Sequence, residues 1–346
     1  MAVVSTVRRP VVPWRTLVAV TGLLVLSVLA VRSISAAGFA AIQNFLLVFG
    51  SLLVEALPFI LLGAAVSALI EVYVPASFFA RVARLPRGVQ MPIAGFGGFA
   101  FHVCECGSVP VARRLISKGL APSAAITFMF AAPILNPVVL IATAVAYRGR
   151  DVMWPMVLGR AGLGLVVAMA VGWVVGRKSG AELLRVRGDE PRVPEPGVLE
   201  GHDHEHDHVP PTEGRGSAYF GQLADDFTML TRYLVIGAAI AAALQTFVPQ
   251  QVLGAVADTP VIDILALMAL ATMLSLCSES DAFVAASFVQ FGMSAQLAFL
   301  VSGPMIDAKL GVLYAGTFTR GFVRTAVLII FAVTLAGSLW MQVIFG

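Results

Sequence analysis

Long apolar stretches separated by short polar ones run along most of the chain. They predict about seven membrane-crossing helices, at residues 15–36, 43–73, 121–147, 152–177, 220–248, 295–318 and 321–345. Each stretch is long enough to cross a hydrocarbon core about 30 Å thick at a rise of about 1.5 Å per residue. The pattern therefore predicts an all-α polytopic membrane protein.

Two further apolar segments, at about 89–117 and 259–291, carry a polar interruption near their middle. Arginines and lysine lie on both sides of the first segment, in 81–87 and 113–119, and such residues mark cytoplasmic loops. A segment that starts and ends on the same side has not crossed, so we expect two re-entrant broken-helix hairpins. If both segments cross instead, the chain has about nine membrane segments and its repeats are parallel.

The two halves of the chain are related in sequence. "LLGAAVSALIEVYVP" (Leu61–Pro75) aligns without gaps with "VIGAAIAAALQTFVP" (Val235–Pro249). Further on, Cys104 corresponds to Cys277, Gly119 to Gly292, and "PILNP" from Pro133 to "PMIDA" from Pro304. The loop with Arg81, Arg84 and Arg87 has a counterpart at 249–258 with no lysine or arginine, which puts equivalent loops on opposite sides of the membrane. We therefore expect two inverted structural repeats.

These features divide the chain into four parts. They are an N-terminal tail with the first transmembrane helix (1–42), transmembrane repeat 1 (43–177), a His-rich linker (178–218) and transmembrane repeat 2 (219–346). The linker is rich in proline, glycine and charge and has no apolar periodicity, which is typical of a flexible, solvated, cytoplasmic segment. Arginines before the first apolar run would also suit a cleaved signal peptide, but an uncleaved helix fits a membrane-embedded chain better.

Composition supports the bilayer as solvent and excludes several classes of protein. Of the 346 residues, 58% are hydrophobic and 12% charged, and the mean hydropathy is +0.89, outside the usual range of soluble domains. The net charge of +3 is scattered, so no nucleic-acid partner is expected. There is no phosphate-binding loop of the G-x-x-x-x-G-K-[ST] type, so ATP hydrolysis is not expected either. We predict no enzymatic activity and no cofactor.

Polar residues inside the apolar segments define a candidate substrate site. In transporters with inverted repeats, broken helices from both halves meet near the membrane midplane, and carboxylates placed there are costly unless they are paired or protonated. The predicted substrate-binding residues are Cys104, Glu105, Cys106, Ser108, Asn136, Cys277, Ser278, Glu279, Asp281 and Asp307. The predicted helix breaks are Pro110, Pro133, Pro137 and Pro304.

The chemistry of this set suggests soft ligands beside proton carriers. All three cysteines fall in the two predicted tips, and thiolate suits soft metals and, by the same polarizability, trivalent arsenic. Buried cysteines also serve simply as small hydrophobic residues. Glu55, Glu279 and the other intramembrane carboxyl groups are candidate proton carriers, because burial favours their neutral form. Asp307 is equally well placed to pair with Lys309 or Arg320.

A histidine-rich run in the linker, "HDHEHDH", offers a second chemistry. His202, His204, His206 and His208 alternate with carboxylates, a combination that suits zinc or cobalt, although such tracts often serve as plain solvated linkers. A divalent metal transporter is therefore an alternative function. A membrane thiol redox protein is a further alternative, but the chain has C-x-C where a C-x-x-C pair would be expected.

The stretch "FHVCECGSVPVARRLISKGLAPSAAITFMFAAPILNPVVL" (Phe101–Leu140) resembles a family of predicted bacterial permeases that includes the ArsP-type organoarsenical efflux permeases. The resemblance covers about residues 45–345, and it rests on the C-E-C-G-S-x-P block followed by P-x-L-N-P. It implies a multi-pass permease of the bacterial inner membrane and, for the arsenical members, export of trivalent methylated or aromatic arsenicals driven by an ion gradient. From the intramembrane carboxyl groups we expect the coupling ion to be the proton. The permease's partners are then a small-molecule or ion substrate and the lipid bilayer, and assembly into a homo-oligomer is compatible with the sequence. The N-terminus and linker would be cytoplasmic.

Overall fold

The computed structural model describes residues 36–100, 103–185, 215–247 and 261–345. Every regular element in these ranges is a helix, which confirms the all-α polytopic architecture. Five helical segments are long and apolar enough to cross a membrane by length and composition: Ala41–Tyr73, Pro122–Ala146, Met153–Val175, Gly216–Thr246 and Arg320–Ile344. The predicted first helix, at residues 15–36, lies almost entirely outside the described residues.

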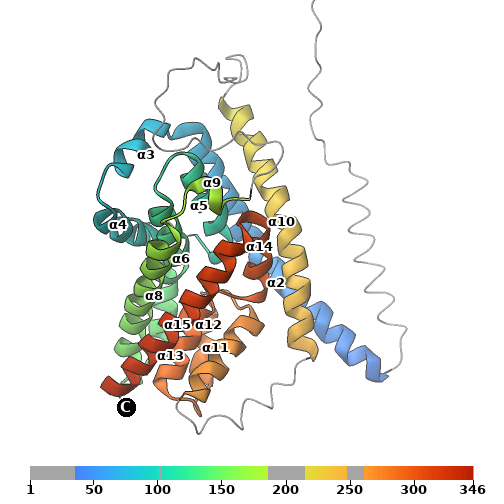
Figure 1. Cartoon of the computed structure of the whole chain (residues 1–346). Coiled ribbons are helices and arrows are strands. Elements are labelled where there is room, and N and C mark those ends of the chain that lie inside the picture. Colours follow the sequence, from blue (N-terminus) through green and yellow to red (C-terminus); the bar gives the residue numbers. More distant parts are fainter. Residues whose placement is uncertain (1–35, 101–102, 186–214, 248–260, 346) are drawn as a thin grey trace, which may run out of the picture.

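Helices follow one another in the same order in the two halves (Figure 1). The first half contains α2 (Ala36–Tyr73), α3 (Ala76–Ala83), α4 (Arg87–Ala100), α5 (Glu105–Ser117), α6 (Pro122–Leu135), α7 (Pro137–Ala146) and α8 (Met153–Val175). After the short α9 (Gly180–Leu183), the second half contains α10 (Arg215–Phe247), α11 (Ile262–Leu274), α12 (Asp281–Ser287), α13 (Met293–Ser302), α14 (Ala308–Thr317) and α15 (Arg320–Phe345). The helix bounds agree with the predicted segments to within a few residues, apart from the breaks described below.

Helices that correspond in sequence run in opposite directions. In Figure 1, α2 rises from the lower right and α10 descends beside it, and the two helices pack against each other. In the same way α8 rises while α15, which contacts it, descends. Antiparallel equivalent helices are what inverted repeats require. The inverted-repeat arrangement itself stays a prediction that these directions support.

Four interruptions divide the apolar segments into half-helices. The interruptions separate α4 from α5, α6 from α7, α11 from α12, and α13 from α14. The halves on either side of the Cys-containing breaks have 14, 13, 13 and 7 residues, so each extends roughly 20 Å or less, short of a ~30 Å core. A single half-helix of this length therefore ends inside the core, and the re-entrant hairpins stay a prediction.

At three of the four breaks, a side chain satisfies the exposed start of the following helix. Cys104 Sγ accepts from the backbone N–H of Gly107, 3.4 Å away, and Asn136 Oδ1 accepts from that of Val138 at 3.0 Å. Asp307 Oδ1 accepts from the N–H of Leu310 at 2.6 Å, while Ser275 ends α11 in the left-handed region at φ 48°. The caps leave backbone ends satisfied inside the apolar interior.

Two of the four predicted helix-breaking prolines do not break a helix. Pro110 lies inside α5 and Pro133 inside α6, because a proline within a helix removes a single hydrogen bond and bends the helix without necessarily ending it. Pro137 does follow a break, at the first position of α7, and Pro304 lies between α13 and α14. The breaks depend on the capping residues more than on proline.

Folded structure also extends into the predicted linker. Leu183 and Leu184 are buried, and this segment pairs with the α14–α15 connection through Arg185 N to Thr317 O and Thr319 N to Leu183 O, both at 3.0 Å. The described chain then resumes at Arg215 as α10. Two buried leucines therefore fasten the start of the linker to the second half, and the His run at 202–208 lies outside the described residues.

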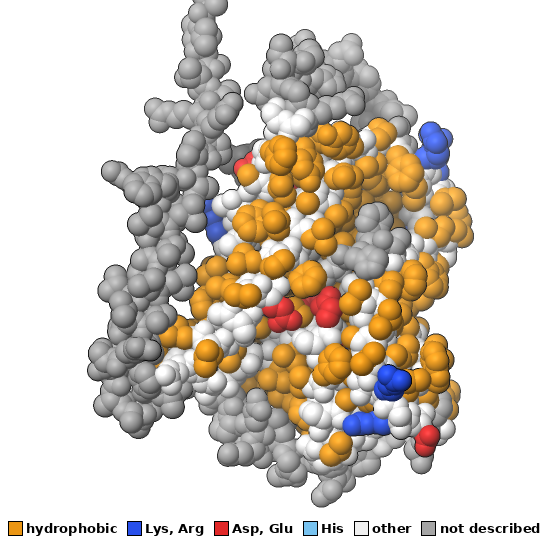
Figure 2. Space-filling view, turned by 180° about the vertical axis from the view of Figure 1, so that it is seen from behind, with side chains coloured by type: hydrophobic (Ala, Val, Ile, Leu, Met, Phe, Trp, Pro, Cys, Tyr) orange, Lys and Arg blue, Asp and Glu red, His pale blue; other side chains and the backbone are white. Residues whose placement is uncertain are grey.

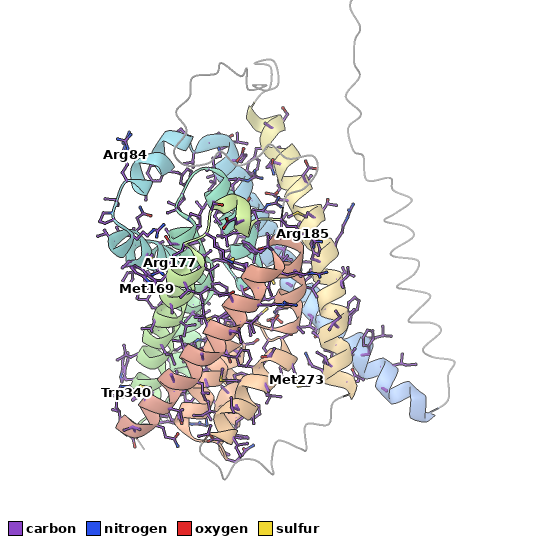
Figure 3. The ribbon with its side chains drawn as sticks, in the orientation of Figure 1. Arg84, Met169, Arg177, Arg185, Met273 and Trp340 are labelled. Carbon is purple, nitrogen blue, oxygen red and sulfur yellow. The ribbon has the colours of Figure 1, made fainter. Side chains whose placement is uncertain are left out.

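The outer surface is apolar over a broad band, as expected for contact with lipid. Large hydrophobic side chains such as Leu47, Leu328 and Val343 are 69–81% exposed, and Figure 2 shows hydrophobic side chains over most of one face. Arg84 lies at the upper end of the molecule and Trp340 near the lower end (Figure 3). This distribution suits a basic upper end and an aromatic residue near the opposite membrane boundary.

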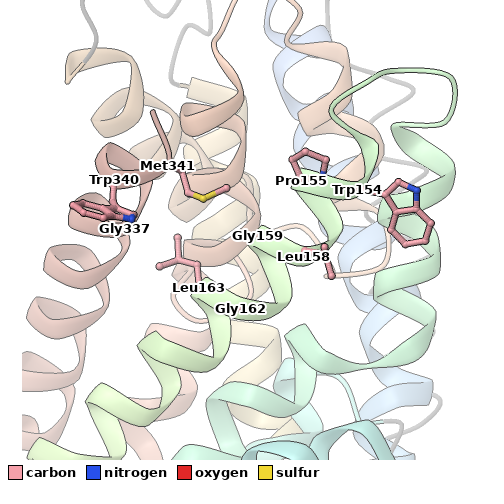
Figure 4. Close-up of a pocket in the computed structure, with 9 residues that line it drawn as sticks. All are labelled: Trp154, Pro155, Leu158, Gly159, Gly162, Leu163, Gly337, Trp340 and Met341. Atoms are coloured by element: carbon pink, nitrogen blue, oxygen red, sulfur yellow. The ribbon is translucent and has the colours of Figure 1, made fainter. Parts of the chain in front are cut away.

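An apolar groove of ≈460 Å³ lies between α8 and α15 (Figure 4). Trp154, Leu158, Leu163, Trp340 and Met341 line it together with glycines and a proline. None of the predicted site residues lines this groove. It has no polar ligands to offer, so the candidate site lies elsewhere.

Candidate functional site

The two Cys-containing breaks meet at Glu105, the first residue of α5. One of its carboxylate oxygens, Oε2, accepts from Ser278 Oγ in the second break at 3.1 Å. The other, Oε1, lies 3.1 Å from the ammonium nitrogen of Lys309 on α14. Glu105 and Lys309 are 1% and 2% exposed, so a single buried carboxylate joins the first tip to the second half of the chain.

Lys309 is surrounded by further acceptors from the second half. Its Nζ donates to the backbone carbonyl of Ser275 at 3.1 Å and lies 3.8 Å from Cys277 Sγ. Asp307 Oδ2 is 3.6 Å away. Carboxylate, carbonyl and thiol from three separate segments of the chain thus face one ammonium group.

Local sequence explains why these groups are held in place. Glu105 occupies the first turn of α5, where the exposed N–H groups and the helix dipole favour a negative charge. Asp307 is the N-cap of α14, which places Lys309 in the first turn of that helix. Ser275 Oγ accepts from the N–H of Ala308 at 3.2 Å, so the two breaks of the second half are fastened to each other.

A second buried ion pair lies beside this centre. Arg160 on α8 donates to both oxygens of Asp281, at 2.8 and 2.7 Å. It also donates to Thr143 Oγ1 at 2.9 Å and to the carbonyl of Ser278 at 3.1 Å. Arg160 is 0% exposed and Asp281 2%. This pair fixes the start of α12 to α7 and α8 of the first half.

The three cysteines are free and buried. Cys104 caps α5, Cys277 faces Lys309, and Cys106 is buried in the first turn of α5, next to Glu105. In the described part of the chain, no group of three or more His, Cys, Asp or Glu side chains is arranged to hold a metal ion. The sulfur atoms therefore lie around the centre without forming a ready-made ligand set.

Of the other predicted site residues, Asn136 and Ser108 bond to the backbone of their own segment, whereas Glu279 lies near the centre. Asn136 caps α7, and Ser108 Oγ donates to the carbonyl of Glu105 within its own helix, so both serve their own backbone. Glu279 is half-buried, and its charge interacts with Glu105 and with Glu55 of α2. Figure 2 shows acidic side chains near the middle of a largely apolar face.

Sequence reasoning missed Arg160 and treated Lys309 only as a partner for Asp307. Arg160 is the single charged residue of α8, and an isolated charge within an apolar span marks a functional or paired position. The signal was thus present for Arg160. Nothing in the sequence near Lys309 indicates that Glu105, 204 positions away, is its closest partner.

Comparisons with known proteins find a matching family model and two similar proteins. The profile of a family described as "Predicted permease" matches residues 41–343. The Bacillus subtilis UPF0718 protein YcgR is 38% identical over 300 residues, which cover 85% of this chain and 96% of that protein. A Streptococcus mutans protein called "Putative two-component membrane permease complex subunit" is 34% identical over 285 residues, 82% of this chain and 90% of that protein. No solved structure matches.

Proposed function

Since the chain belongs to this family of predicted permeases, we propose that it is a secondary-active permease of the bacterial inner membrane that exports a thiophilic metalloid, such as a trivalent organoarsenical. The observation that carries this proposal is the meeting of both tips at Glu105 and Lys309, with Cys277 beside them. Polar groups gathered between broken helices are the usual form of a transporter's substrate site.

Thiol chemistry supplies the argument for the substrate class. Trivalent arsenic prefers soft sulfur ligands, and the chain places all of its cysteines in the two tips. Since the three sulfur atoms are not arranged as a ligand set, we propose that the two tips approach each other when the substrate binds. Such movement is compatible with half-helices that are joined to the bundle by capped breaks.

Coupling and assembly are further parts of the proposal. Half-buried carboxyl groups such as Glu279 would exchange protons as the substrate moves, so we propose an antiport with the proton. The Streptococcus mutans relative is named as a subunit of a two-component permease complex. We propose that this chain likewise works beside a second membrane subunit or a second copy of itself, with the N-terminus and the linker in the cytoplasm.

Replacing Cys104 by serine tests the arsenical proposal sharply. Serine is a favourable N-cap, so Cys104→Ser keeps the start of α5 and removes only the soft ligand. Wild-type protein in an arsenic-sensitive strain should confer methylarsenite resistance, and Cys104→Ser should lose most of it at an equal amount in the membrane. Ser117→Ala, at the exposed end of the same helix, is the control. Full resistance in the serine variant, or none in the wild type, would contradict the proposal.

The His run favours a second candidate, transport of a divalent metal such as zinc or cobalt. Deleting residues 200–210 should then change the cellular content of that metal severalfold, because histidine and carboxylate ligands would no longer collect it. Deleting 189–199, a segment of equal length without histidine, is the matched control. An unchanged metal content in both deletions, measured by elemental analysis, would exclude a role of the run in metal transport.

A further inference from the structure

The ammonium group of Lys309 lies among several acceptors, at a position where a bound cation would also lie. The side chain is 2% exposed. It faces Glu105 Oε1 and the Ser275 carbonyl at 3.1 Å, Asp307 Oδ2 at 3.6 Å and Cys277 Sγ at 3.8 Å. These acceptors come from α5 and from both breaks of the second half, so they converge on one point.

Carboxyl groups outnumber basic groups around this point in the described part of the chain. Glu105 and Asp307 share a single ammonium, because Arg160 is already used by both oxygens of Asp281, and Glu279 lies in the same tip as Ser278, which contacts Glu105. Asp307 Oδ2 and Glu279 Oε2 are buried and accept no hydrogen bond among the described residues, and Asp307 is only 3% exposed. Excess negative charge in an apolar interior is costly, so this arrangement attracts additional positive charge.

The two buried basic residues differ in how firmly they are held. Arg160 is a planar guanidinium bound by a two-point contact at 2.7 and 2.8 Å, with two further acceptors. Lys309 is a point charge at the end of a flexible stem, with longer contacts. Its backbone is fixed, since a Cβ placed on Gly237 would lie 2.7 Å from Lys309 Cα. Of the two basic side chains, that of Lys309 is therefore held less firmly.

We propose that the position of the Lys309 ammonium is a cation-binding site, from which a small inorganic cation displaces the lysine. The oxygen acceptors lie 3.1–3.6 Å from the ammonium nitrogen, farther than oxygen ligands lie from a bound metal ion. After the lysine swings away, Glu105 and Asp307 close on a smaller ion at the shorter distances that oxygen ligands make. The meaning of the exchange for transport rests on the permease function proposed above, whereas the binding itself does not.

Thermal unfolding of Lys309→Met in lipid nanodiscs tests the site without any transport assay. Methionine keeps most of the stem and removes the charge, so the vacated position should take a cation. We expect a saturable rise in Tm of several degrees with one of Na⁺, K⁺ or Zn²⁺ relative to choline at equal ionic strength. The wild type should show a much smaller rise, because its own ammonium competes.

Two further variants make the result decisive. Lys309→Met combined with Glu105→Gln should lose the cation response, and Arg160→Met, which leaves one carboxylate at an enclosed position, should show none. A rise of equal size in Arg160→Met would mean that any unpaired buried carboxylate responds, which overturns the proposal. Lys309→Gln replaces Lys309→Met if that variant does not accumulate. The proposal is also overturned if neither Lys309→Met nor Lys309→Gln responds to a cation, or if neither variant accumulates in cells, which are rich in K⁺. Both results leave the resistance test above unaffected.

Discussion

Arg160→Met is expected to lower the free energy of unfolding by about 3–5 kcal/mol, the usual cost of breaking a buried ion pair from one side. The substitution leaves Asp281 charged and without its two-point partner, at a position where both residues are almost completely buried. The start of α12 also loses the contact between Arg160 and the Ser278 carbonyl. Unfolding in mixed micelles of increasing denaturing detergent would measure the loss.

Two comparisons separate the lost pair from a general effect of losing an arginine. Arg324→Met, at an exposed position of α15, should change stability by less than about 0.5 kcal/mol. Adding Asp281→Leu to Arg160→Met should recover much of the stability, because an apolar pair of similar volume replaces an uncompensated charge. A loss below about 1 kcal/mol in Arg160→Met would show that the pair is not the main connection between α8 and the second tip.

The places where helices break could be predicted from the sequence to a large extent. Apolar length gave the long helices, and the repeated polar interruptions located the breaks at Cys104 and Cys277. The predicted helix breaks at Pro110 and Pro133 lie inside α5 and α6, and the interruptions fall instead at Cys104 and Asn136, whose side chains cap α5 and α7. A cap joins a side chain to a backbone N–H no more than three residues further on, so it is a local feature of the sequence. Whether a given cysteine or asparagine forms a cap still depends on whether that helix end is buried away from water.

The charged pairs of the site could not be predicted, because they join residues far apart in the chain. Arg160 and Asp281 are 121 positions apart, and Lys309 and Glu105 are 204 apart. Local pattern shows that each charge needs a partner, but the choice among several carboxylates depends on how the helices pack. Asp281 illustrates this: its sequence neighbourhood predicts a substrate ligand, whereas in the fold both of its oxygens bind Arg160.

Replacing Gly63 by alanine should cost about 1–3 kcal/mol through overpacking. An added Cβ on Gly63 of α2 would clash with the backbone of Gly107 in α5, and a backbone atom cannot move aside as a side chain can. The helices must therefore separate. Gly50→Ala on the same helix meets nothing within 4 Å, so it should be neutral or slightly stabilising, within about 1 kcal/mol. Equal stability of the two variants in detergent unfolding would contradict the close contact.

Gly63 and Gly237 occupy equivalent positions in the aligned stretches of the two halves, and each one fixes one side of the same ion pair. Gly63 contacts α5 two residues after Glu105, and Gly237 contacts the backbone of Lys309. Alanine at either position should lengthen the Glu105–Lys309 contact of 3.1 Å. Because both substitutions strain one pair, their effects in a double-mutant cycle should fall short of the sum by about 0.5 kcal/mol or more. Strict additivity would mean that the two glycines act on separate parts of the core.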